Sequence, residues 1–199
     1  YYRKIFSVFK GYDTKSVSLT KESAAFFLWK KGEAMFKEGD FIIYGSNGVC
    51  QVEHIGSMDL QGVPGDKMYY TLVPVYEEKS RLFTPVDNHK VVMRPVISKK
   101  EACELIDHMQ EMQVFEIQNE KNRDTVFKEA LKTGDCEELV RVIKTIYEKK
   151  QERKAQGKKV TAGDERYFKL AEEHLYGELA IALGIEKDKV SSYIEKRIA

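Results

Sequence analysis

The chain has 199 residues, of which 42% are hydrophobic and 33% are charged, and this composition is typical of a folded globular protein. Its most apolar stretch, 24–29, is far shorter than the ~18–20 residues that a bilayer span requires, so we expect a cytoplasmic protein that does not bind a membrane. Three separated cysteines and four scattered histidines match no disulfide framework or metal motif, so we expect reduced thiols, no metal and no cofactor.

Residues 1–34 have no sustained strand or helix period, and we expect the folded protein to begin after them. The codons for 30–34 can contain GGAG just upstream of the codon for Met35. We therefore predict that the native chain begins at Met35 and that 1–34 is a translated leader or an added expression sequence. A secretory signal is the alternative, but charged side chains interrupt its apolar segment, namely Lys10, Asp13, Lys15, Lys21 and Glu22.

Between 39 and 96 the sequence predicts a β-rich module of short strands separated by turn signals. Asn47-Gly48 favours a tight hairpin turn, because both residue types readily adopt positive φ. Pro74 indicates an edge position or a bulge, because proline cannot donate to a strand ladder. We expect a five-stranded β-barrel module with strands at 40–44, 48–55, 67–76, 81–85 and 91–96.

After residue 95 the apolar period becomes that of helices. Ser98 with Glu101 forms a capping-box pattern, so we place a domain boundary at Ser98, and Asp135 with Glu138 repeats the pattern. The fold class is therefore α+β, with a β domain at 35–97 and an all-α helical domain at 98–199. Its helices are expected from 98 onward, and at 119–132, 135–155, 161–183 and 187–198.

The net charge of +1 conceals one strongly basic stretch between Arg141 and Lys159. It contains eight basic and two acidic side chains, a local net charge of +6. Such a stretch would provide sequence-independent affinity for DNA phosphates, although a solvated helix face has the same pattern. From charge alone, the two interpretations are equally good.

No pattern in the sequence supports catalysis. The chain has no nucleophile elbow, phosphate-binding loop or dinucleotide fingerprint, and Gly45-Ser46-Asn47-Gly48 lies in the predicted hairpin instead of between a strand and a helix. Adjacent acidic pairs such as Glu137-Glu138 point apart on a helix, which suits solvated surface better than acid–base work. The sequence therefore predicts a binding protein and not an enzyme.

Short motifs occur in both predicted domains. Their positions are 39–52 (Gly-Asp, Tyr-Gly and Gly-Val), 69–72 (Tyr-Tyr-Thr-Leu), 83–88 (Phe-Thr-Pro-Val-Asp-Asn), 93–96 (Met-Arg-Pro-Val), 127–135, 139–143 and 177–183. In order and spacing these motifs resemble the CarD/CdnL family of bacterial transcription regulators. The resemblance extends from 35 to 185, and it implies a Tudor-like β module shared with transcription-repair coupling factors.

The resemblance implies that the β domain binds the β-subunit lobe of bacterial RNA polymerase. An edge strand would suit this contact, because its unpaired backbone groups can accept a strand of the partner. The candidate contacts are Met58, Arg81 and Phe83.

The resemblance also implies that the helical domain lies on promoter DNA, along the phosphate backbone and in the minor groove, and stabilises the open complex. We expect the protein to act as a monomer. The DNA-binding candidates are basic side chains of the helices: Lys121, Arg123, Lys128, Arg141, Lys149, Lys150, Arg153 and Lys154.

One family feature is missing. Family members often carry a tryptophan near the start of the second helix that wedges into the minor groove, but here Glu120 falls near that place and the only tryptophan is Trp29. A carboxylate near phosphate is unfavourable, so we predict backbone binding by Lys121 and Arg123 with weaker stabilisation of the melted DNA. The main alternative is an adaptor whose helices bind another protein, and an unrecognised enzyme ranks third.

Overall fold

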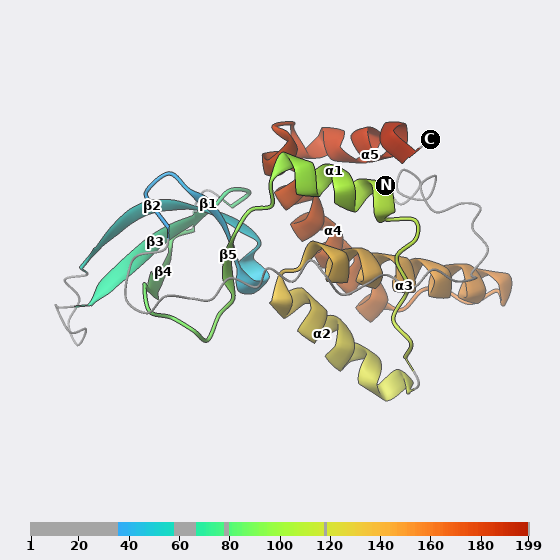
Figure 1. Cartoon of the computed structure of the whole chain (residues 1–199). Helices are drawn as coiled ribbons and strands as arrows, with labels where there is room; N and C mark the ends of the chain where they lie inside the picture. Colours follow the sequence, from blue (N-terminus) through green and yellow to red (C-terminus); the bar gives the residue numbers. More distant parts are fainter. Residues whose placement is uncertain (1–35, 58–66, 78–79, 118, 199) are drawn as a thin grey trace.

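The computed structural model of the chain describes residues 36–57, 67–77, 80–117 and 119–198 (Figure 1). The expected leader at 1–34 and the polymerase-contact candidate Met58 lie outside these residues. A β-sheet comes first in the chain, and a group of helices packs beside it (Figure 1). Within the described ranges, no helix is long and apolar enough to cross a membrane.

Five antiparallel strands form one sheet in the order β4-β3-β2-β1-β5. Their bounds are β1 Phe41–Tyr44, β2 Val49–Ser57, β3 Met68–Pro74, β4 Leu82–Pro85 and β5 Met93–Pro95. All five predicted strands are present, and the α+β class is confirmed. The expected barrel is wrong: closure requires ladder bonds between the edge strands, whereas the short strands β4 and β5 lie at opposite edges of an open sheet.

The first hairpin turns where the sequence predicts. A 3-10 turn, η2 (Gly45–Asn47), joins β1 to β2, and the Tyr44 amide donates to the Gly48 carbonyl at 3.0 Å. Gly48 has a φ of +68°, a conformation that glycine adopts without steric cost. The hairpin therefore follows from local turn chemistry.

Pro74 does not mark an edge strand or a bulge. Strand β3 lies inside the sheet, but Pro74 is its last residue and lies beyond its final pair with β4, Leu72 with Leu82. The register irregularity is in β2, between Val52 and His54. The missing amide of proline thus falls where β3 has no β4 neighbour.

Five α-helices follow the sheet, and α2 and α5 are each preceded by a 3-10 turn. The Ser98 capping box is confirmed, since the Ser98 hydroxyl accepts from the Glu101 amide and the Glu101 carboxylate accepts from the Ser98 amide. The bounds are α1 Lys99–His108, η3 Glu120–Asn122, α2 Arg123–Thr133, α3 Cys136–Ala155, α4 Ala162–Leu183, η4 Lys187–Lys189 and α5 Val190–Ile198.

The second predicted capping box is only half formed. The Asp135 carboxylate accepts from the amides of Glu137 and Glu138 and so caps α3. The Asp135 amide, however, donates to the Thr133 hydroxyl at 3.2 Å, and the Glu138 carboxylate pairs with Arg141 at 2.8 Å. A neighbouring cation has replaced the reciprocal bond.

Each half of the protein has its own hydrophobic core. The sheet core and the helical core are separate clusters of buried side chains, and the helical one is larger and includes all five helices. Fully buried members are Ile42, Tyr70 and Leu72 in the sheet, and Ile106, Phe127 and Leu179 in the helices. The orientation of one half against the other therefore depends on the contacts at their junction.

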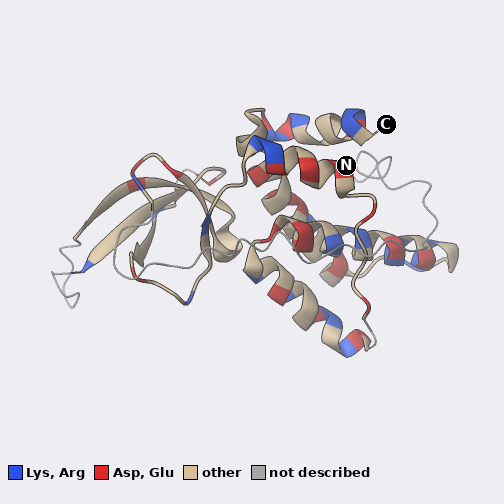
Figure 2. Cartoon of the chain, in the orientation of Figure 1, with Lys and Arg blue, Asp and Glu red and all other residues tan. Residues whose placement is uncertain are grey.

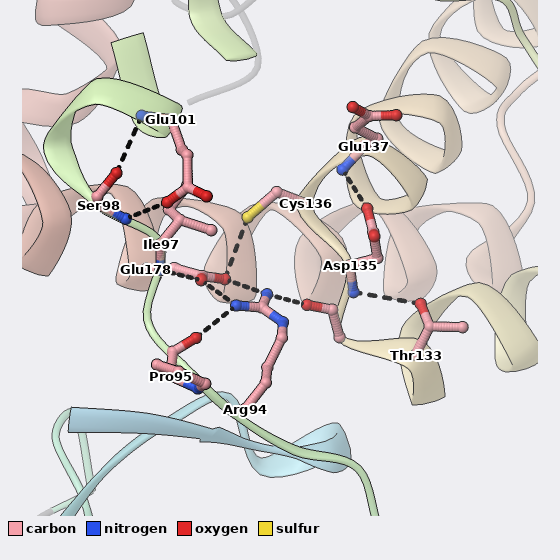
Figure 3. Close-up of polar contacts among 11 residues, drawn as sticks. Arg94, Pro95, Ile97, Ser98, Glu101, Thr133, Asp135, Cys136, Glu137 and Glu178 are labelled. Carbon is pink, nitrogen blue, oxygen red and sulfur yellow. Dashed lines mark hydrogen bonds and ion pairs between the residues drawn. The ribbon is translucent and has the colours of Figure 1, made fainter. Parts of the chain in front are cut away.

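A buried ion pair forms the centre of this junction (Figure 3). Arg94 of β5 donates to both carboxylate oxygens of Glu178 of α4, at 2.5 Å to Oε1 and 2.7 Å to Oε2. Only 1% of the Glu178 side chain is exposed. The Ile97 amide donates to Oε1 at 3.0 Å and the Cys136 thiol to Oε2 at 3.1 Å, so each buried oxygen accepts two hydrogen bonds.

Arg94 also donates to the Gly134 carbonyl at the end of α2 and to the Pro95 carbonyl. Burial by itself would lower the pKa of Arg94, but Glu178 outweighs burial and holds this pKa above its usual value. Burial, followed by the charge of Glu178, raises the pKa of the Cys136 thiol well above its usual value. The thiol is therefore a neutral donor to the carboxylate.

Close backbone approach tightens the junction. A Cβ at Gly134 would lie 2.8 Å from Cγ2 of Ile43 in β1. A Cβ at Gly177 of α4 would lie 2.8 Å from the Tyr76 ring, and the Tyr76 hydroxyl donates to the Gly177 carbonyl at 3.0 Å. A larger side chain at either glycine would force the Ile43 side chain or the Tyr76 ring to shift from its packed position.

Glu178→Ala is expected to lower the free energy of unfolding by about 3–5 kcal/mol, because it leaves Arg94 and the Ile97 amide without their buried acceptor. Urea denaturation followed by circular dichroism measures this loss. The control is Asp107→Ala, which removes an equally bidentate but exposed partner from Arg197 and should cost much less. Equal losses in the two variants would contradict the role of the junction.

Candidate nucleic-acid interface

Strand β4 is one edge of the sheet and carries or adjoins two of the candidate partner contacts. Phe83 is 50% exposed and lies opposite Thr71 of β3. Arg81, two residues earlier, forms a bidentate pair with Glu53 of β2, with Nε to Oε2 at 2.7 Å and Nη2 to Oε1 at 2.8 Å. This pair lowers the pKa of Glu53. The structure thus places Arg81 and Phe83 together at an exposed edge, with Arg81 held by a partner that the sequence did not indicate.

The first part of the basic stretch is used inside the protein. Lys144 of α3 is 9% exposed, and its ammonium donates to the carbonyls of Met109, Gln110 and Met112, just beyond α1. Burial lowers the pKa of Lys144, whereas the carbonyl acceptors favour its charged form. Lys144 therefore caps the end of α1 from a neighbouring helix.

Arg141 has a similar structural role one turn earlier. Its guanidinium lies 4.1 Å from the centre of the Phe115 ring, and its Nε donates to the Gln113 carbonyl at 3.2 Å. Its Nη1 pairs with Glu138 at 2.8 Å. This candidate DNA contact thus holds the segment between α1 and α2 against α3.

The last turns of α3 carry four candidate cations that differ in their exposure. Lys154 is exposed, while Lys149, Lys150 and Arg153 are half-buried. Burial lowers the pKa of Lys150. Nε of Arg153 donates to the Lys159 carbonyl at 2.7 Å, which holds the following loop against the helix. The accessible positive charge therefore lies at the end of the basic stretch and not along its whole length.

The two candidates next to η3 differ in exposure. Lys121 is exposed, whereas only 17% of the Arg123 side chain is accessible. The Arg123 guanidinium lies 2.9 Å from Glu120 and 3.2 Å from Asp164 of α4. Lys121 therefore presents its charge at the surface, and Arg123 is engaged in an internal ion-pair cluster.

Glu120 connects the start of α2 to the end of α3. Its carboxylate binds Nζ of Lys149 and also faces Arg123. The hydrogen bond from Lys149, followed by the charges of Arg123 and Arg153, lowers the pKa of Glu120. The sequence indicated only that Glu120 would repel phosphate. Its pairing was missed because Lys149 is 29 residues away and no local pattern connects the two.

Charges of both signs alternate along α2 and α3 (Figure 2). Lys128, another candidate, pairs with Asp124 one turn earlier on α2 at 2.6 Å. Both side chains are more than half exposed, so this is a surface pair that a competing anion can open at little cost. The candidate interface is thus a mixed surface with an excess of cations at the end of α3.

The described residues contain no group of three or more histidine, cysteine or acidic side chains that could hold a metal ion. Two of the cysteines are buried, and burial raises the pKa of the Cys50 thiol to about 12. The described surface offers charged side chains for ion pairs and hydrogen bonds, together with exposed apolar side chains such as Phe83.

Two family models match the chain, and each falls on one structural half. A model described as CarD-like/TRCF RID domain matches residues 36–97, which contain the whole sheet. A model described as CarD, C-terminal domain matches residues 104–195, which contain α2, α3 and α4, the second half of α1 and most of α5. The Arg94–Glu178 pair therefore joins one matched unit to the other.

Lys144→Met is expected to lower the free energy of unfolding by about 1–3 kcal/mol, because it leaves buried carbonyls at the end of α1 without a donor. Lys154→Met, the same change at an exposed position of the same helix, should alter stability by less than about 0.5 kcal/mol. Urea unfolding of both variants distinguishes structural from surface cations. Equal stabilities would contradict the capping role of Lys144.

Proposed function

The chain belongs to the CarD/CdnL family, and on this premise we propose that it is a transcription regulator that binds bacterial RNA polymerase and promoter DNA together. The proposed domains are 35–97 for polymerase and 98–199 for DNA. The junction at Arg94 and Glu178 carries this proposal. It fixes the sheet, whose β4 edge is open, in one orientation against a helical unit that has a basic end.

The proposed polymerase contact is the β-subunit lobe, bound along β4. On its other side β4 has no strand partner among the described residues, so its backbone groups can accept a strand of the polymerase. Phe83 would supply apolar contact area, and Arg81 would contribute through a geometry already set by Glu53.

The proposed DNA contact is to the phosphate backbone at the end of α3 and next to η3. Lys121 and Lys154 are exposed, and Lys150 and Arg153 are half-buried on the same helix as Lys154. Phosphate contacts position a protein on DNA without reading its sequence. Because Glu120 cannot insert between bases as an aromatic side chain would, the proposed effect on the open complex is stabilisation by backbone and minor-groove contacts alone.

An adaptor that binds polymerase through its sheet and another protein through its helices is the second candidate function. The observation that favours it is the internal pairing of several DNA-binding candidates. Arg123, Lys128, Arg141 and Lys149 each have a carboxylate partner within the chain. Only the remaining cations would then have to serve as solubilising surface.

Phe83→Ser is expected to weaken capture of RNA polymerase by at least about tenfold, because it removes the proposed aromatic anchor of the β4 edge, and a few anchor residues carry most of the binding energy of an interface. Pull-down of purified bacterial polymerase over a concentration series measures the loss. Phe41→Ser is the control, since Phe41 is also an exposed aromatic residue but lies on β1, inside the sheet. Undiminished capture by the Phe83 variant would contradict docking along β4.

The wild-type protein is expected to bind duplex DNA at low salt, with an affinity that falls as salt rises. Lys154→Gln should reduce the slope of log affinity against log salt by about one, because one phosphate contact is lost. Fluorescence anisotropy with a labelled duplex measures the slope. The control is Lys196→Gln on α5, which lies across the helical half from α2 (Figure 1). Failure of the wild type to bind at low salt would favour the adaptor.

A further inference from the structure

Glu120 lies between cations from two helices of the helical half, α2 and α3. One carboxylate oxygen binds Nζ of Lys149 on α3, and the other lies 2.9 Å from Nη1 of Arg123 at the start of α2. Arg123 reaches Asp164 of α4 at 3.2 Å. The Glu120 side chain itself is 65% exposed, whereas Lys149 and Arg123 are only 22% and 17% exposed. Glu120 is thus the accessible member of a cluster whose cations are mostly covered.

The contact between Glu120 and Arg123 leaves hydrogen-bonding capacity unused. Nη1 of Arg123 is buried and has no hydrogen-bond partner, although Oε2 of Glu120 is only 2.9 Å away. The two atoms are therefore close enough for charge attraction but are not aligned for a hydrogen bond. A guanidinium has five N–H donors in a planar fork, so another anion in the place of Glu120 can be bound in a better geometry.

The charges of the cluster favour an anion at the position of Glu120. Arg123, Lys149 and Arg153 oppose Glu120 and Asp164, which leaves a net charge of +1. Without Glu120 the same group would carry +2. The Lys149 hydrogen bond, followed by the nearby arginines, lowers the pKa of Glu120, so the carboxylate is ionised at neutral pH. An ionised carboxylate and a DNA phosphate each carry one negative charge and accept hydrogen bonds from the same donors.

We propose that Glu120 is an internal competitor for DNA phosphate. Its carboxylate occupies the cations of Lys149 and Arg123, and a backbone phosphate of duplex DNA binds them only by displacing it. This inference rests on the proposed DNA binding, and it adds that Glu120 lowers the affinity of the protein for DNA. Glu120 is mostly exposed and lies in a single 3-10 turn, so it can move aside without disturbing the helical core.

The test compares Glu120→Gln with Glu129→Gln in the full chain. Both changes remove one negative charge from the same region, but Glu129 pairs with Lys132 within α2 at 2.8 Å and lies outside the cluster. Anisotropy with a labelled duplex should show that Glu120→Gln binds about three- to tenfold more tightly at low salt, with a salt slope steeper by about one. Glu129→Gln should match the wild type, and both variants should keep the wild-type melting temperature.

A second variant tests which cation is released. Adding Lys149→Gln to Glu120→Gln should remove most of the gain in affinity, because the phosphate then loses the donor that Glu120 holds. Poly-glutamate serves as a second probe in place of DNA. If Glu120→Gln binds poly-glutamate more tightly than the wild type does, but binds duplex DNA no more tightly, the cations bind an acidic protein, and the proposal is overturned.

The outcomes separate this inference from the proposed function. Equal DNA affinities of the two single variants, with a wild type that binds DNA, would overturn the inference and leave the function standing. A wild type that does not bind, together with a Glu120→Gln variant that does, would support the inference and overturn DNA binding by the native protein. No binding by any of the three proteins at low salt would overturn both.

Discussion

The bidentate pair between Arg94 and Glu178 is the interaction on which the arrangement of the two halves depends. The sheet and the helices have separate cores, so no continuous apolar cluster sets their relative orientation. Burying the Glu178 carboxylate carries a large desolvation cost, which the two bonds from Arg94 and those from Ile97 and Cys136 offset. A protein proposed to hold polymerase and DNA together needs such a fixed junction, because its two binding surfaces must stay in register.

In the basic stretch, tertiary contacts give residues of the same charge different roles. Lys144 and Arg141 bind carbonyls of the segment after α1, while Lys154 on the same helix remains exposed. An ammonium in a buried position stays charged only if acceptors surround it, and the free carbonyls at a helix end meet that need. Local net charge therefore overstates the charge that a DNA partner would meet.

The elements and their ends were predictable because their causes are local. The strands follow turn chemistry such as that of Gly48, and α1 begins at Ser98 because a hydroxyl and a carboxylate three residues apart satisfy each other's amides. The barrel was a wrong prediction, because closure depends on whether two distant edge strands meet. In the second capping box the Asp135 carboxylate forms its hydrogen bonds, but the Glu138 carboxylate does not return one, because it pairs with Arg141.

The sequence by itself determined the strands, most helix caps, the class of fold and the family, since these depend on neighbouring residues and ordered motifs. Only the tertiary structure decided which charges pair between separate elements. Glu178 lies in an apolar segment, which is a signal of a buried carboxylate, yet its partner Arg94 is 84 residues away. Glu120 and Lys149 are 29 residues apart. Ion pairs between separate elements have no periodicity along a chain, because they depend on distances that exist only once the helices and the sheet have packed.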